Sequence, residues 1–251
     1  MKWPHDPATD QTPVAQSATD VVNTAAHIKD LRGVDAAISV CRACPRLVQW
    51  REEVAHLKRK SFADQEYWGR PVFGFGPADA EIIVIGLAPA AHGGNRTGRV
   101  FTGDRSGDWL YRAMFRAGLA RIETSTSIDD GQELINTRLL AAVRCAPPEN
   151  APTPAERDTC SPWLDRELAL LSRARTYVAL GSFAWGTLLA ALTRRGVALP
   201  SPRPRFAHAA ELRLPSGELL LASFHPSQQN TFTGRLTEEM LDAVFAKAAA
   251  G

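Results

Sequence analysis

The sequence has few of the features that mark membrane-spanning or secreted proteins. Its longest apolar runs, such as 82–85 and 219–222, are far shorter than the roughly 20 residues that a membrane-spanning helix needs. Residues 1–20 have no apolar core and no cleavage pattern. Hydrophobic residues make up 45% of the chain and charged residues 22%, which is ordinary for a globular protein. We therefore expect a cytoplasmic protein with a core that needs no disulfides.

Lysine is also scarce, with five lysines among the 29 basic residues and a net charge of +2. The charge is uneven, because residues 41–60 carry +4 and residues 93–116 carry +3. A locally basic face on a nearly neutral protein suits an anionic polymer such as a nucleic acid. An ordinary solvated surface is the alternative that charge alone leaves open.

Strand-like and helix-like stretches alternate in the second two thirds of the chain. The buried strands are expected at 82–86, 139–143, 177–180 and 219–224, and the helices between and after them at 107–119, 154–173, 183–193 and 236–249. Earlier, one helix is expected to include residues 21–31 and stop at Gly33, and another to span 47–60. This alternation predicts an α/β fold with a mostly parallel, four-stranded sheet covered on both faces. Residues 1–16 are expected to form a disordered tail, and residues 17–251 a single domain.

Three of the four predicted strands end in a loop of unusual polar content. These loops span residues 86–104, 145–153 and 225–235. Ligand sites in open α/β sheets gather at the carboxyl ends of the strands. The first loop has 19 residues, which is longer than a connection requires. We expect the three loops to meet in one crevice.

The four cysteines have the spacing of a metal site. Cys41 and Cys44 form a C-x2-C pair, and Cys145 and Cys160 follow after a gap of 100 residues. Disulfides are rare in the cytosol, whereas four cysteine ligands suit zinc or an iron–sulfur cluster. The spacing leaves the metal open, and four unrelated buried thiols are the alternative.

The three loops carry motifs that resemble those of a known family. The stretch 86–104, GLAPAAHGGNRTGRVFTGD, resembles the first motif of the family 5 (type B) uracil-DNA glycosylases, and 225–236, HPSQQNTFTGRL, resembles their second. The stretch 143–153 is similar to their cluster-binding middle segment. The resemblance covers roughly residues 40–245 and implies a three-layer α/β/α sandwich. It also implies that the four cysteines hold a [4Fe–4S] cluster.

The chemistry that this resemblance implies can be assigned to particular side chains. Uracil is flipped out of the DNA and its bond to the sugar is broken, which leaves positive charge on the sugar and negative charge on the base. His225, if neutral, can donate to the developing oxyanion. Asp104 can orient the attacking water, or it can simply cap the next helix. Phe101 can stack on the flipped base or anchor the core.

Further contacts follow from the same resemblance. Asn150 resembles a second polar group that contacts water or base, with a turn residue as its alternative. Ala88 and Asn230 are expected to bind substrate. The stretch 228–234 resembles the loop that enters the duplex, where Phe232 could fill the vacated space.

The sequence departs from the related family 4 at two positions. Leu87 stands where family 4 carries an acidic residue, and Ala141 stands where family 4 has an Asn that reads the uracil edge. With Ala90 and Ala91 also small, we expect a wider pocket that accepts hypoxanthine as well as uracil in double-stranded DNA.

The three loops contain no lysine, so a Schiff-base lyase has no nucleophile there. We therefore expect a monofunctional glycosylase that uses water, acting as a monomer on damaged double-stranded DNA and initiating base excision repair. A non-catalytic iron–sulfur or zinc module that binds nucleic acid is the alternative. An α/β hydrolase would need a G-x-S-x-G elbow, which the sequence lacks.

Overall fold

The computed structural model describes residues 3–251, so residues 1 and 2 of the predicted disordered tail lie outside the described residues. Five strands form one sheet in the order β2-β1-β3-β5-β4. The first four of these are parallel: β2 (Thr137–Ala141), β1 (Ile82–Gly86), β3 (Thr176–Leu180) and β5 (Leu219–Ser223). The predicted count of four was one short, because β4 (Glu211–Arg213) adds an antiparallel edge strand. It has only three residues and no apolar run, so no local pattern predicts it.

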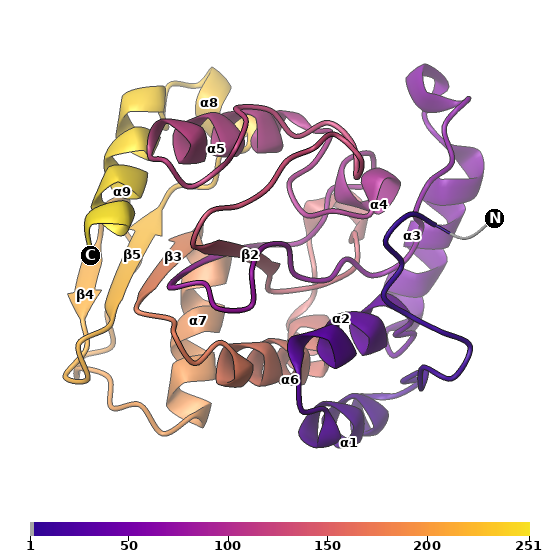
Figure 1. Cartoon of the computed structure of the whole chain (residues 1–251), viewed down its shortest axis with the longest axis horizontal. Coiled ribbons are helices and arrows are strands. Elements are labelled where there is room, and N and C mark those ends of the chain that lie inside the picture. Colours follow the sequence, from indigo (N-terminus) through magenta and orange to yellow (C-terminus); the bar gives the residue numbers. More distant parts are fainter. Residues whose placement is uncertain (1–2) are drawn as a thin grey trace.

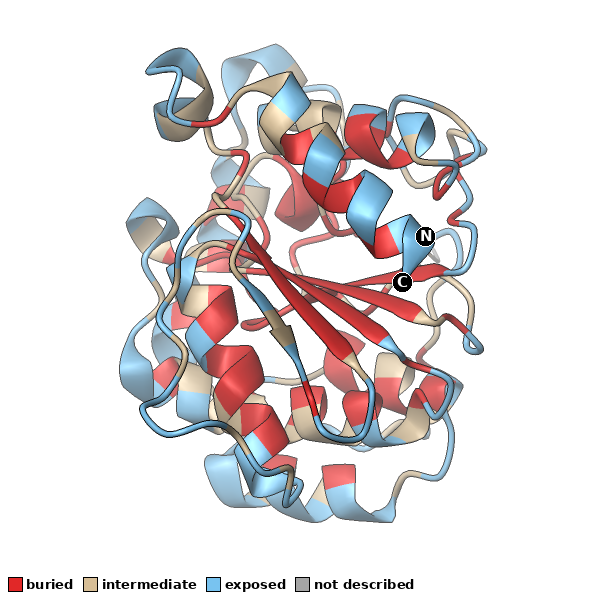
Figure 2. Cartoon of the chain, turned by 90° about the vertical axis from the view of Figure 1, so that its left-hand side faces the viewer, coloured by how far each residue is buried: buried red, intermediate tan, exposed pale blue. Residues whose placement is uncertain are grey.

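Helices cover both faces of this sheet, as predicted (Figure 1). One face packs against α5 (Arg105–Arg116) and α9 (Glu238–Ala250), and the other against α6 (Pro154–Leu170) and α7 (Ser182–Arg194). Side chains alternate along β1, so that Val84 joins the first core and Ile83 the second. Figure 2 shows the buried strands between helices whose outer faces are exposed.

The single helix predicted around residues 21–31 is wrong, because the chain forms two helices there. They are α1 (Ala18–His27) and α2 (Leu31–Ser39). The Asp30 carboxylate accepts a hydrogen bond from the Gly33 backbone N–H and starts α2. Gly33 therefore lies in the first turn of a helix instead of ending one. Both helices pack against α6, and α3 (Pro45–Leu57) follows them.

The described part of the predicted disordered tail lies against the domain. The Trp3 and Trp68 ring centroids are 5.5 Å apart. Arg70 donates to both carboxylate oxygens of Asp6, and the Ala15 side chain is buried. Residues 3–16 are thus packed on the surface that the rest of the chain forms.

Short helices interrupt the three polar loops, which the sequence suggested were irregular. They are α4 (Gly94–Thr97), η2 (Pro148–Asn150) and α8 (Gln228–Phe232); a further turn, η1 (Lys60–Phe62), follows α3. Thr153 and Glu156 form a capping box at the start of α6. Among residues 3–251, no helix is both long and apolar enough to cross a membrane.

Candidate active site

The three polar loops meet in one cleft at the carboxyl ends of the parallel strands, as expected. The cleft has a volume of about 580 Å³. The β1 loop lines it with Ala88, Phe101 and Asp104 among others, and the β5 loop lines it with His225. The loop after β2 contributes Asn150. Three segments that are distant in the sequence thus form one wall.

Asp104 caps the following helix, which is one of the two roles that the sequence left open, and it also lines the cleft. Its Oδ1 accepts a hydrogen bond of 2.9 Å from the Gly107 backbone N–H, so the side chain caps α5. The same residue lines the cleft. Burial raises the pKa of the Asp104 carboxyl, and the hydrogen bonds at the start of α5 oppose that rise. A carboxylate with restricted solvation at a cleft wall is suited to accept a proton from water.

Two glycines make room for the side chains of this wall. A Cβ atom on Gly93 would lie 2.0 Å from Oδ2 of Asp104, and one on Gly86 would lie 2.5 Å from the Phe101 ring. Any larger residue at either position would displace the carboxylate or the ring. The glycines of the first motif therefore determine where its functional side chains lie.

His225 lies beside Phe101 at the cleft wall. The two ring centroids are 5.7 Å apart and the ring planes are inclined by 32°. Burial lowers the pKa of His225 to about 4. The imidazole is therefore neutral at physiological pH and can donate one N–H to an oxyanion without carrying a charge of its own.

The remaining predicted contact residues occupy different positions. Asn150 is exposed at the rim, with a left-handed backbone at φ 55° that Asn tolerates well. Asn230 is not among the residues that line the cleft; its Nδ2 donates to the His225 carbonyl at 2.9 Å and holds that loop. Sequence reasoning gave no individual role to six lining residues. Ser227, Gln228 and Gln229 lie inside the second motif, and the others are Arg105, Ser106 and Glu149.

The four cysteines line one small cavity between α2, α3, α6 and the loop after β2. Burial raises the pKa of Cys44 to about 12, so this thiol is no ready nucleophile. Within the described residues, no group of three or more His, Cys, Asp or Glu side chains is arranged to hold a single metal ion. Cys41 and Cys44 precede β1 by about 40 residues, and the fold brings them close to Cys145 and Cys160.

Two buried arginines face the cysteine cavity. Arg51 donates to Sγ of Cys145 at 2.9 Å and to the Cys41 carbonyl at 3.0 Å. Arg144 is paired with Glu167, but its Nε and Nη1 have no partner in the described part of the chain. Unpaired buried donors are costly. Together with four thiols, they fit an anionic group that these residues surround.

Most arginines of the two basic stretches are buried or paired with carboxylates. Arg51, Arg96 and Arg99 are buried. Other arginines of these stretches are paired with carboxylates: Arg42 with Glu52, Arg46 with Glu156, and Arg116 with Glu238 and Asp242. Counting charges along the chain therefore overestimates the charge available to a partner. Arg59, Lys60 and Arg105 are exceptions, because they are exposed and have no ion pair among the described residues; Arg105 lies at the cleft, over the Phe232 ring at 4.6 Å.

We predict that His225 titrates near pH 4, well below the usual value of about 6.5 for histidine. The unfolded chain binds this proton at higher pH, so the stability of the fold should decrease as the pH falls from about 6.5 to about 4. NMR of ¹⁵N-labelled histidine rings measures the titration, and His225→Gln identifies the signal. A His225 signal that titrates near 6.5 would contradict the prediction.

Comparisons with known proteins agree with this geometry. Residues 73–249 match the profile of the family described as the uracil DNA glycosylase superfamily. A type-5 uracil-DNA glycosylase of Mycobacterium tuberculosis is 57% identical over 216 residues, which are 86% of this chain and 79% of that protein. The type-5 enzyme of Thermus thermophilus is 52% identical over 84% of this chain and 93% of its own. That of Pyrobaculum aerophilum is 46% identical over 84% and 88%. The chain therefore belongs to the uracil-DNA glycosylase superfamily, among the type-5 enzymes.

Proposed function

We propose that this protein removes uracil from DNA by hydrolysing the bond between base and sugar, and so initiates base excision repair. One observation carries the proposal: a half-buried carboxylate, Asp104, and a neutral imidazole, His225, come from different loops and face the same cleft. Their chemistry matches the two charges that develop as this bond breaks.

Each side chain then has one task. Asp104, when ionised, orients the attacking water and offsets the positive charge on the sugar. His225 donates an N–H to the oxygen of the departing uracil, and Asn230 holds the backbone of His225 in place. Phe101 offers an aromatic face beside the imidazole on which the flipped base can stack.

Entry of the base requires its extrusion from the duplex, which costs a few kcal/mol. Phe232 is 64% exposed on α8 and lies next to Arg105 at the cleft mouth. A large exposed ring on the loop after His225 is suited to fill the space that the base leaves. We therefore propose double-stranded DNA as the substrate.

Incubation with a uracil-containing duplex should produce alkali-labile sites, and borohydride should trap no enzyme–DNA adduct. Asp104→Ala should lower the single-turnover rate by about 10²–10⁴-fold. Asp108→Ala is the matched control, since this carboxylate lies one turn further along α5 and does not line the cleft. A protein that binds the duplex but leaves it intact would be the non-catalytic module instead. A trapped adduct would contradict water as the nucleophile, because borohydride traps the Schiff base that an amine forms.

We also propose that the four cysteines hold a [4Fe–4S] cluster with a structural role. The support is the common cavity, the all-thiol donor set and the unpaired donors of Arg144 beside it. When bound, the cluster would tie the segment after α2 to the loop after β2 and to α6. It would lie apart from the cleft, because none of its ligands lines the cleft.

Protein purified without oxygen should be brown and contain about four irons and four sulfides per chain. Cys44→Ser and Cys160→Ser should lose the colour, because each removes one ligand. Asp104→Ala should keep the colour while losing activity, which separates the cluster from the chemistry. Colourless, active protein with stoichiometric zinc would contradict the proposal.

The range of bases is the third part of the proposal. Ala88 and Ala90 line the cleft and leave space beside Phe101. Ala141 and Ala91, which the sequence argument also used, are not among the lining residues, and Ala141 is buried at the end of β2. Space for the larger hypoxanthine ring therefore comes from Ala88, Ala90 and the volume of the cleft.

We predict that the protein releases hypoxanthine as well as uracil from double-stranded DNA. Asp104→Ala should slow release of the purine more, because a purine can be protonated as it leaves and then needs less help from His225. His225→Ala should slow uracil release more, by about 10²–10³-fold. Single-turnover rates of both variants on both bases measure the division. Equal reductions, or no hypoxanthine release by the unmodified protein, would contradict it.

A further inference from the structure

Phe101 has an unusual backbone for its residue type. Its φ of 51° lies in the left-handed region, which bulky side chains rarely adopt. Such a conformation is energetically unfavourable and persists only where the surroundings fix it. Phe101 also carries the ring that faces His225. The contacts that fix this one residue therefore control part of the cleft wall.

Hydrogen bonds to backbone groups hold the residues on both sides of Phe101. Val100 accepts a hydrogen bond from the Thr102 hydroxyl at 3.1 Å. The Gly103 N–H donates to the Ser125 carbonyl at 2.8 Å, and the Gly103 carbonyl accepts from Arg96 at 2.9 Å. The turn is thus held before and after the aromatic ring, and one of its partners comes from a segment outside the motif.

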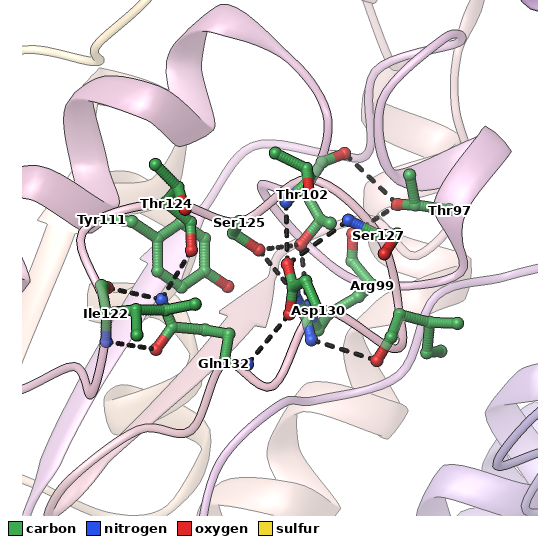
Figure 3. A network of polar contacts seen from close by, with 12 residues as sticks. Thr97, Arg99, Thr102, Tyr111, Ile122, Thr124, Ser125, Ser127, Asp130 and Gln132 are labelled. Atoms are coloured by element: carbon green, nitrogen blue, oxygen red, sulfur yellow. Dashed lines mark hydrogen bonds and ion pairs between the residues drawn. The ribbon is translucent and has the colours of Figure 1, made fainter.

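That segment, residues 122–132, contributes a buried polar network (Figure 3). The Ser125 hydroxyl lies 2.7 Å from both Oγ1 of Thr102 and Nη2 of Arg99. Asp130 accepts from the same Nη2 at 2.5 Å, and Arg99 donates in turn to Oγ1 of Thr102 at 3.0 Å. Each of these side chains is at most 10% exposed.

The network is itself fixed from outside. The Asp130 carboxylate also accepts from the backbone N–H groups of Thr126 and Gln132, at 2.8 and 2.9 Å. The Gln132 amide donates to the carbonyls of Ile122 and Thr124. The segment is therefore a rigid support with the Asp130 and Ser125 side chains directed at the Phe101 turn.

We propose that Ser125 and Asp130 are positioning residues, which act through Arg99 and Thr102 to hold the Phe101 ring in place for the flipped base. This inference rests on the proposed excision of uracil, but on neither the cluster nor the wider range of bases. Neither residue lines the cleft, so their effect must pass through the turn.

A double-mutant cycle tests this route. Asp130→Asn should lower the single-turnover rate on uracil by about tenfold, with little change in DNA affinity, because the ring is misplaced and not lost. In a Phe101→Ala background the same substitution should lower the rate by less than about twofold, since no ring is left to position. Asp129→Asn is the matched control. Asp129 is the neighbour of Asp130 in the sequence, but its carboxylate is exposed and, among the contacts of the described chain, pairs only with His5.

Ser125→Ala provides a second cycle if Asp130→Asn lowers the melting temperature below the assay temperature. Equal reductions of the rate in both backgrounds would overturn the inference, because the network would then support the fold alone. An unmodified protein without activity on uracil would overturn the proposed function instead.

Discussion

Backbone hydrogen bonding aligns the carboxyl ends of four parallel strands, and the whole candidate site depends on that alignment. Gly86 at the end of β1 is paired with Ala141 of β2, and Leu180 of β3 with Ser223 of β5. The following loops therefore start at one edge of the sheet. This is how Asp104 and His225, 121 residues apart in the sequence, come to share a cleft.

The sequence was sufficient to predict the parts of the fold that depend on local patterns. The unbroken apolar run of β1 predicted its bounds, and the helix predicted from residue 154 begins there as α6. The start of β2 was placed two residues late, because Thr137 and Arg138 are polar. Arg138 is buried in the strand through its ion pairs with Asp35 and Glu167, and no local pattern reveals such distant partners.

The same limit applies to the site. The motif loops and their convergence followed from the sequence, because strand ends and glycine-rich stretches are local signals. Ser125 and Asp130 gave no signal, since their partners lie 26 and 31 residues away and their own segment has no periodicity.

The abundance of arginine also had a different meaning from the one that charge suggested. Buried arginines satisfy loop carbonyls, as Arg96 does for His92 and Gly103, which a lysine with its single nitrogen could not do in the same way.

The network behind Phe101 also has a consequence for local unfolding. Its bonds to Arg99 and Thr102 join residues 23–31 positions apart, so the first motif and its support form a contiguous piece of chain. His225 belongs to a different piece. Proteins open in contiguous cooperative units. We therefore expect amide hydrogens of the Phe101 turn and of the His225 loop to exchange with solvent at different rates.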